Sequence, residues 1–198
     1  MRHEGFRFIL DNGAWTSFTR EEPWDESAFR VAMGKLAGDE LCDGVVAPDI
    51  VMGGKESFRM SMGWLEEIRE VTAGDVYLPV QPGITAEECR APLASGRVSL
   101  FVGGDSRWKE ETAASWARLA HEHGAKCHVG RVNSLRRLMI VKAAGADSFD
   151  GSGPSRFEKH LWEMDRFRRT PAQTVIPSLA LVDLDEETID EERARRLA

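Results

Sequence analysis

The sequence predicts an α/β fold, namely a (β/α) barrel of the TIM type that is reduced or incomplete. Three observations predict it. Short apolar runs of strand character alternate along the chain with longer stretches of helical periodicity, and strands that alternate with helices are parallel. No GxGxxG or GKS motif follows the first predicted strand, which disfavours an open nucleotide-binding sheet. Six or seven strand-helix units are present, fewer than the eight of a complete barrel.

The predicted strands are short runs rich in Val, Ile, Leu and Phe, and each ends at a polar residue or a glycine. They cover residues 6–13, 43–49, 76–81, 98–104, 126–131 and 147–150. Residues 173–182 could add a seventh strand. Pro177 disfavours it, because proline has no backbone N–H to donate within a sheet.

The predicted helices follow the strands, and some carry start signals. They cover residues 25–40, 56–71, 85–96, 108–124, 134–145 and 155–169. Asp25 is expected to cap the first of them, because its carboxylate can accept a hydrogen bond from a backbone N–H in the first turn. Thr85 and Glu88 have the spacing of a capping box at the third.

The length of 198 residues predicts one domain over residues 1–182, followed by a charged, acidic tail over residues 183–198. The apolar runs are too short for a membrane span, and no signal peptide is recognisable, so we expect a cytoplasmic protein. Cys42, Cys89 and Cys127 are odd in number and form no CxxC pattern. This predicts buried free thiols instead of a disulfide framework or a structural zinc site.

The net charge of −7 argues against a protein that coats nucleic acid. The charge is unevenly distributed, however, because basic residues outnumber acidic ones between Arg131 and Arg169. That segment is either a solvated helical surface or a surface for phosphates, and the charge pattern alone leaves both interpretations open.

Polar residues and glycines recur at the carboxyl ends of the predicted strands, where a barrel carries its active site. They are Asp11, Asp49, Gln81, Gly103 with Gly104, Gly130 and Asp150. Carboxylates from separate strands suit the cleavage of a glycosidic bond, in which one attacks the anomeric carbon and another handles the proton. An amide such as that of Gln81 can read the edge of a base, and glycines let a flat ring lie against the backbone.

Each of these residues also has a plainer interpretation. An aspartate after a strand is often a helix cap or turn residue, and a glycine pair is often only a tight turn. His121, His123 and His128 are not expected to bind a metal, because "HEHG" lies at the polar end of a predicted helix. The recurrence of such residues at the same point of successive units favours a functional site.

Six phrases in register resemble one enzyme family. They are "LDNGAW", "VVAPDIV", "LPVQPGIT", "LFVGGDSRWK", "HVGRVNS" and "AGADSFDGSGPSRF". In order and spacing they are similar to motifs of the tRNA-guanine transglycosylase superfamily, and more closely to its DNA-directed, DpdA-type branch found in phages and bacterial genomic islands. The resemblance covers residues 6–157, and it implies the barrel fold and a pentosyltransferase activity.

The resemblance implies a role for each matched residue. Asp150 corresponds to the catalytic nucleophile, and Asp11 to the aspartate proposed to move protons. Asp49 and Gln81 correspond to the residues that recognise the base, and the glycines that contact it are matched by Gly103, Gly104 and Gly130. Arg156 lies where the family contacts the nucleic-acid backbone. The other basic residues expected to contact phosphates are Arg131, Arg136, Arg137 and Lys159.

The implied reaction is base exchange: Asp150 attacks C1′ of a flipped-out guanosine, and a 7-deazaguanine base then displaces the carboxylate. The incoming base implied is 7-cyano-7-deazaguanine, a co-substrate, and no cofactor is required. The family's zinc motif is missing, because no cysteine follows Asp150, so no metal is expected.

The implied polymer is DNA. The chain lacks the extensions of the tRNA enzymes, so tRNA is the less favoured substrate, and a homo-oligomer or a partner protein could complete the barrel and the nucleic-acid groove. No membrane partner is expected. Two alternatives stay open: an enzyme that acts on tRNA or a free nucleoside, and a non-catalytic subunit that binds a deazaguanine or DNA. The presence of both Asp11 and Asp150 argues against the second.

Overall fold

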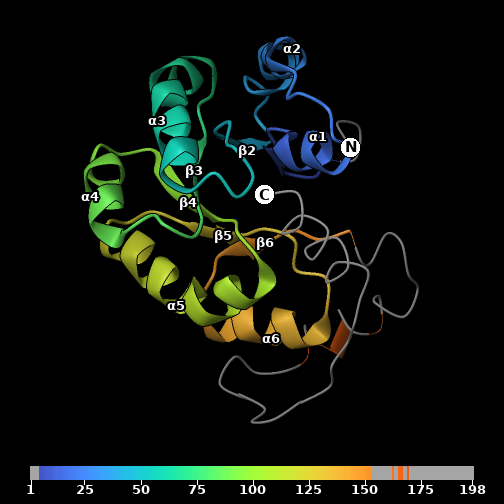
Figure 1. Ribbon diagram of the computed structural model, residues 1–198, viewed down its shortest axis with the longest axis vertical. Coiled ribbons are helices and arrows are strands. Elements are labelled where there is room, and N and C mark those ends of the chain that lie inside the picture. The colour runs from blue at the N-terminus through green and yellow to red at the C-terminus, as the bar shows by residue number, and fades with distance from the viewer. Residues whose placement is uncertain (1–4, 153–161, 163–164, 167–168, 170–198) are drawn as a thin grey trace. The chain divides into compact units, whose positions relative to one another are not determined.

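The computed structural model describes residues 5–152 together with residues 162, 165, 166 and 169 (Figure 1). The chain divides into two compact units, residues 1–101 and residues 102–198. The predicted seventh strand over residues 173–182 and the predicted acidic tail over residues 183–198 both lie outside the described residues. The domain boundary predicted at residue 182 lies there too.

In the described part of the chain, six strands form one sheet, in which they follow one another in chain order from β1 to β6. The strands are β1 (Phe8–Leu10), β2 (Cys42–Val46), β3 (Asp75–Val80), β4 (Val98–Val102), β5 (Cys127–Val129) and β6 (Ser148–Phe149). Strand β2 runs parallel to β1 and to β3, and β5 runs parallel to β6. A doubly wound sheet reverses its strand order, so the α/β class with sequential parallel strands is confirmed, and the order is compatible with a reduced (β/α) barrel.

The described residues of the first unit, 5–101, form four helices. They are α1 (Ala14–Thr19), α2 (Glu26–Leu36), α3 (Gly54–Val71) and α4 (Ala86–Ala94). The predicted N-cap of α2 is confirmed, since the Asp25 carboxylate accepts from the Ala28 N–H at 2.9 Å. The capping box of Thr85 and Glu88 at α4 is also confirmed. The helix predicted over residues 25–40 ends earlier, at Leu36, and a turn follows in which Asp39 accepts from the Leu41 N–H.

Helix α1 was not predicted. Its six residues include two threonines, a tryptophan and a phenylalanine, which are weak helix formers. The turn before it is closed by Asn12, whose Oδ1 accepts from the Ala14 N–H at 2.8 Å. A helix this short forms because tertiary contacts hold its ends, which local propensity does not record.

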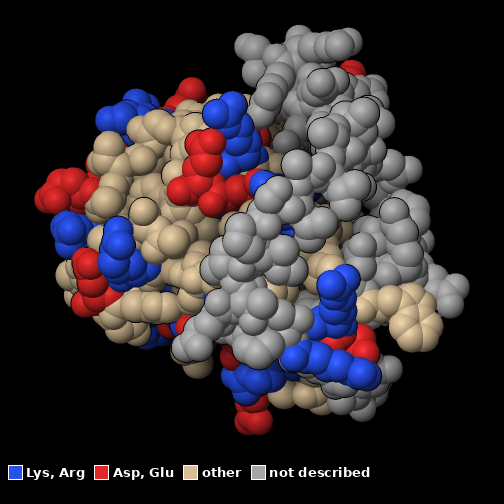
Figure 2. All heavy atoms as spheres, turned by 90° about the horizontal axis from the view of Figure 1, so that it is seen from below, with Lys and Arg blue, Asp and Glu red and all other residues tan. Residues whose placement is uncertain are grey.

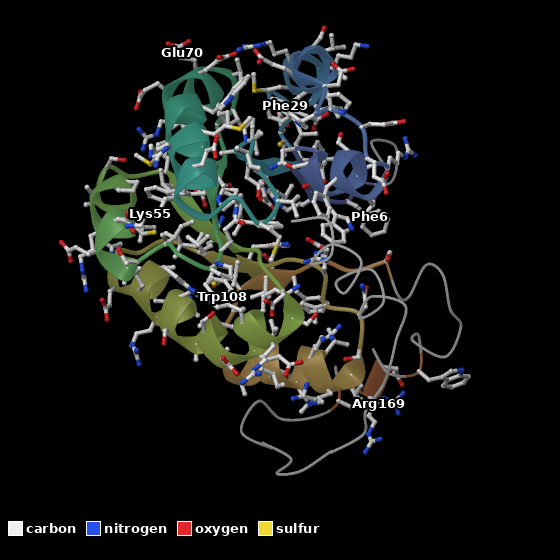
Figure 3. All side chains as sticks on the ribbon, in the orientation of Figure 1. Phe6, Phe29, Lys55, Glu70, Trp108 and Arg169 are labelled. Atoms are coloured by element: carbon white, nitrogen blue, oxygen red, sulfur yellow. The ribbon has the colours of Figure 1, made fainter. Side chains whose placement is uncertain are left out.

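An aromatic cluster joins α2 to α3 in the first unit. Phe29, labelled in Figure 3, lies 5.6 Å from Trp64 between ring centroids, and Trp24 lies 6.0 Å from Trp64. The Phe29–Trp64 and Trp24–Trp64 pairs meet edge to face, the arrangement that the ring quadrupoles favour. Phe29 and Trp64 are buried, so this cluster is the core beneath α2.

The second unit carries helices α5 (Ser106–Glu122) and α6 (Leu135–Ala143). Asp105 caps α5 by accepting from the Trp108 N–H at 2.9 Å, and Ser134 caps α6 by accepting from the Arg137 N–H at 3.4 Å. Trp108, labelled in Figure 3, packs against Trp116 further along α5, with 6.0 Å between the ring centroids. Of the helix predicted over residues 155–169, the described residues are helical.

The three cysteines are free and buried, as predicted. Burial raises the pKa of the Cys89 thiol and of the Cys127 thiol to about 12, so both stay protonated and unreactive at neutral pH. Among the described residues, no helix has the length and apolar character needed to cross a membrane.

We expect Phe29→Ala to lower the free energy of unfolding by about 3–5 kcal/mol, because it leaves a cavity between Trp24 and Trp64. Val31→Ala is the matched control on the same helix. Val31 is 53% exposed, so its truncation should change stability by no more than about 0.5 kcal/mol. Urea unfolding followed by circular dichroism measures both. Equal losses from the two variants would contradict this account of the core.

Candidate active site

Asp150 directly follows β6, and the segment after β5 holds its backbone. Its N–H donates to the Val129 carbonyl at 3.3 Å, and its carbonyl accepts from the Val132 N–H at 2.7 Å. The Asp150 side chain is 50% exposed. A carboxylate at the carboxyl end of a parallel strand is thus held in place by the neighbouring strand while staying open to solvent.

Both carboxylate oxygens of Asp150 receive a hydrogen bond. The Arg131 N–H donates to Oδ1 at 2.8 Å, and His128 Nε2 lies 3.0 Å from Oδ2. The other ring nitrogen of His128, Nδ1, lies 2.8 Å from Ser148 Oγ. His128 pairs with Ser148 in the parallel register, and Ser148 lies two residues before Asp150, so all three side chains lie on one face of the sheet.

Arg131 adopts a left-handed backbone conformation, with φ of 55°, which is uncommon for a residue with a side chain. This conformation accompanies the hydrogen bond from its N–H to Asp150. Its guanidinium Nη2 donates to the Gly104 carbonyl at 2.8 Å. Local strain of this kind is common where a functional group is held in position.

A buried cation lies next to this carboxylate. Lys109, in the first turn of α5, is only 3% exposed, and its ammonium donates to the Gly130 carbonyl at 2.8 Å. The Arg131 carbonyl lies 3.5 Å from the same nitrogen. Lysine is rarely buried unless it is paired, so these carbonyls and the nearby carboxylate account for its position.

The surroundings of Asp150 keep it ionised. Desolvation by burial raises its pKa, but the hydrogen bond and charge of His128, the Arg131 N–H and the charge of Lys109 all lower it and outweigh that effect. The net result is a pKa below the ordinary value for aspartate. An ionised carboxylate at neutral pH can attack or stabilise a positive centre, but it has no proton to give as a general acid.

The predicted base-contacting glycines carry part of this framework. Gly104 has φ of 78° and accepts from Arg131, while Gly130 donates its N–H to the Val102 carbonyl and accepts from Lys109. Gly151, after the nucleophile candidate, has no room for a side chain. A Cβ there would lie 2.5 Å from the Val132 carbonyl oxygen and 2.6 Å from Asn133 Oδ1.

A second polar cluster lies within the first unit, around Asp49. Asn12 is 6% exposed, and its amide nitrogen donates to the Ala47 carbonyl and to Asp49 Oδ1, both at 2.8 Å. Asp11, next to it, is exposed and accepts from the Gly13 N–H at 3.3 Å. The structure therefore makes Asn12 the residue that orients Asp49 and places the Asp11 carboxylate at the surface.

Gln81 is hydrogen-bonded to the loop that follows β2. It is 2% exposed, and its amide nitrogen donates to the Ile50 carbonyl at 3.0 Å and to Ser57 Oγ at 2.6 Å. Ser57 Oγ also accepts from the Ile50 N–H. Both amide protons of Gln81 are thus used within the protein, so a role in reading a base would rest on its carbonyl oxygen.

The described basic candidates bond groups of the protein itself. Arg136 and Arg137 both form ion pairs with Glu110, and Arg131 donates to the Gly104 carbonyl. Arg156 and Lys159 lie outside the described residues. On the face shown in Figure 2, basic and acidic side chains alternate. The phosphate contacts stay a prediction.

Sequence reasoning missed His128, Ser148, Lys109 and Asn12 as site residues. His128 was considered only as a metal ligand. In the part of the chain that the structure describes, no three His, Cys, Asp or Glu side chains gather as a metal site needs. The position of His128, one residue before the end of a strand, could have indicated a site residue. The β5–β6 register that sets it beside Asp150 cannot be predicted from the local sequence.

Comparison with known proteins adds no family assignment. No protein-family model, curated protein or solved structure matches the chain.

We expect the Asp150 carboxyl carbon to titrate below the ordinary aspartate pKa of about 3.9. A ¹³C NMR titration, with Asp150→Asn to assign the signal, measures this. Because the folded-state pKa is lowered, the stability that ionised Asp150 contributes is present above about pH 4 and is lost as pH falls through the lowered value. A midpoint above about 5 would instead make Asp150 a candidate general acid.

Gly151→Ala should destabilise the protein by about 1–3 kcal/mol, because the new methyl group would clash with the Val132 carbonyl. Gly63→Ala is the matched control. It lies within α3 with open space where a Cβ would lie, so the substitution should stabilise the helix by about 0.5–1 kcal/mol. Urea unfolding of both variants checks the opposite signs; a neutral Gly151→Ala would show that the loop after β5 yields easily.

Proposed function

We propose that the protein is a DNA-guanine transglycosylase, which exchanges guanine in DNA for a 7-deazaguanine base such as 7-cyano-7-deazaguanine. The observation that carries the proposal is Asp150: an ionised, half-exposed carboxylate that receives a hydrogen bond on each oxygen at the end of β6. The six phrases that resemble the transglycosylase family support it, because this carboxylate ends the strand in the phrase matched to the family's nucleophile.

The proposed chemistry has two displacements at C1′. Asp150 attacks C1′, the C1′–N9 bond breaks, and the electron pair leaves with guanine, whose N9 then takes a proton from solvent. The incoming base loses its N9 proton to Asp11, which passes it to solvent, and its N9 displaces the carboxylate to form the new glycosidic bond. The two half-reactions mirror each other, so no oxidant, reductant or nucleotide is consumed. A pKa below the ordinary value suits both steps, since Asp150 must be ionised to attack and must leave as a carboxylate.

Base recognition is assigned to the residues around Asp49. Its carboxylate, oriented by Asn12, can accept from the N1–H and exocyclic amine of guanine, the donors on that edge of the base. The Gln81 carbonyl and the backbone of Gly103, Gly104 and Gly130 complete the proposed set. The target nucleotide has to leave the base stack for C1′ to reach a carboxylate at a strand end.

The proposal includes a (β/α) barrel of the TIM type reduced to six or seven units, with a homo-oligomer or a partner protein to complete it. The sequential strand order supports this, because each β/α unit of a barrel pairs with the next. Arg131, Arg136, Arg137, Arg156 and Lys159 are the proposed phosphate contacts. In this proposal Arg136 and Arg137 would exchange Glu110 for a phosphate.

The test is mass spectrometry of nucleosides digested from duplex DNA after incubation with the protein and 7-cyano-7-deazaguanine. We expect the deazapurine deoxynucleoside with wild type and none with Asp150→Asn, because the amide cannot act as the nucleophile. Asp147→Asn is the matched control: it removes a carboxylate three residues earlier that also bonds a histidine, His121, and should keep activity.

Parallel reactions with tRNA and with free guanosine separate the alternatives. Product from tRNA or guanosine and none from DNA would show that DNA is not the substrate and that tRNA or the free nucleoside is. Tight binding of the deazaguanine with no product from any substrate, even with host extract added, would favour a binding subunit and overturn the enzyme proposal.

A further inference from the structure

His128 on β5 and Ser148 on β6 form a hydrogen-bonded chain that leads to the candidate nucleophile, Asp150, directly after β6. Ser148 Oγ lies 2.8 Å from His128 Nδ1, and His128 Nε2 lies 3.0 Å from Asp150 Oδ2. The His128 side chain is 7% exposed, whereas that of Asp150 is 50% exposed. The chain therefore passes from a half-buried serine through a buried imidazole to a carboxylate that is open to solvent.

The direction of the hydrogen bond to Asp150 follows from what each group can donate. An ionised carboxylate only accepts, so the proton between His128 and Asp150 belongs to Nε2, whether the ring is neutral or charged. The Ser148 hydroxyl can donate to a bare Nδ1 or accept from an Nδ1–H. Asp150 thus sets the proton on Nε2, and Ser148 holds the other side of the ring.

We propose that His128, held at Nδ1 by Ser148 with its Nε2–H toward Asp150, is the positioning residue that fixes the orientation of the Asp150 carboxylate. The catalytic consequence rests on the proposed function; the tautomer and the orientation do not. With His128 on Oδ2 and the Arg131 N–H on Oδ1, both oxygens are restrained from different sides. Without His128 only one restraint would remain on a side chain that is half exposed.

The same geometry argues against two other roles for His128, those of a proton carrier for the incoming base and of a base-binding residue. Nδ1 faces Ser148 and Nε2 faces Asp150, so both ring nitrogens are engaged in the protein and neither points to an incoming base. Its contacts are with the attacking group. A positioning role predicts an effect on the rate of the chemical step and little effect on the affinity for the base.

The first experiment reads the tautomer without any assay of activity. Two-bond ¹H–¹⁵N correlation spectra distinguish a ring that carries a proton on Nε2 from a ring protonated at Nδ1 alone, and we expect a proton on Nε2 of His128 in the wild-type protein. Ser148→Ala should keep that proton on Nε2, because Asp150 sets it, and should shift the Nδ1 resonance, because Nδ1 loses its hydrogen bond to Oγ. A wild-type ring protonated at Nδ1 alone, or an Nδ1 resonance unchanged by Ser148→Ala, would overturn the proposal.

The second experiment separates positioning from folding. His128→Gln keeps an N–H donor near the position of Nε2, whereas His128→Leu removes it. We expect His128→Leu to lower kcat by about 100-fold with KM for the base nearly unchanged, and His128→Gln to recover part of that loss. His121→Gln, which alters a second histidine–aspartate contact among the described residues of this unit, is the control and should leave kcat unchanged. Urea unfolding of each variant verifies that it is folded.

The outcomes distinguish the two proposals. If His128→Leu exchanges bases as fast as wild type, His128 does not position the nucleophile, whatever the tautomer. If wild type itself exchanges no base, the proposed function fails. The Asp150 carboxyl signal then tests by itself whether His128 orients the carboxylate. That ¹³C signal should shift in His128→Leu and stay in place in His121→Gln; equal spectra would overturn the positioning role.

Discussion

The candidate site depends on the parallel register between β5 and β6. That register sets His128 opposite Ser148, and the two-residue repeat of a strand sets Asp150 on the same face as Ser148. A slip of one residue would turn His128 away from both and move Val129, which is fully buried, to the other face of the sheet. The burial of Cys127 and Val129 on the opposite face therefore protects the hydrogen bonds of Asp150.

The electrostatic balance around Asp150 follows from the same arrangement. Removing a carboxylate from water disfavours its charge, and only donors and cations fixed nearby can reverse that effect. His128, the Arg131 N–H and Lys109 supply them, and Lys109 in turn is held by the Gly130 carbonyl. Each polar group thus stabilises the next, which is how a partly buried network avoids the cost of unpaired charge.

Local features of the fold were predictable because they use contacts a few residues apart. Asp25 and Thr85 cap their helices through N–H groups three residues on, and the alternation of apolar runs located all six strands. Helix α1 was missed because its start depends on Asn12, a residue held by Ala47 and Asp49 far along the chain. Gln81 is predicted to bind a base, and its amide protons donate to the Ile50 carbonyl and to Ser57 Oγ. These contacts join residues far apart along the chain, so the local sequence does not predict them.

The sequence by itself determined which residues stand where strands end and helices begin, and so it identified Asp150, Asp49 and Gly130 as candidates. Only the tertiary structure decided that Asp150 is ionised, because the hydrogen-bond partners that lower its pKa lie 19 to 22 residues away along the chain. Periodicity and capping are properties of neighbours in sequence, whereas a pKa is set by neighbours in space. Strand register determines which residues distant in sequence become neighbours in space, and it is fixed by packing of the whole unit.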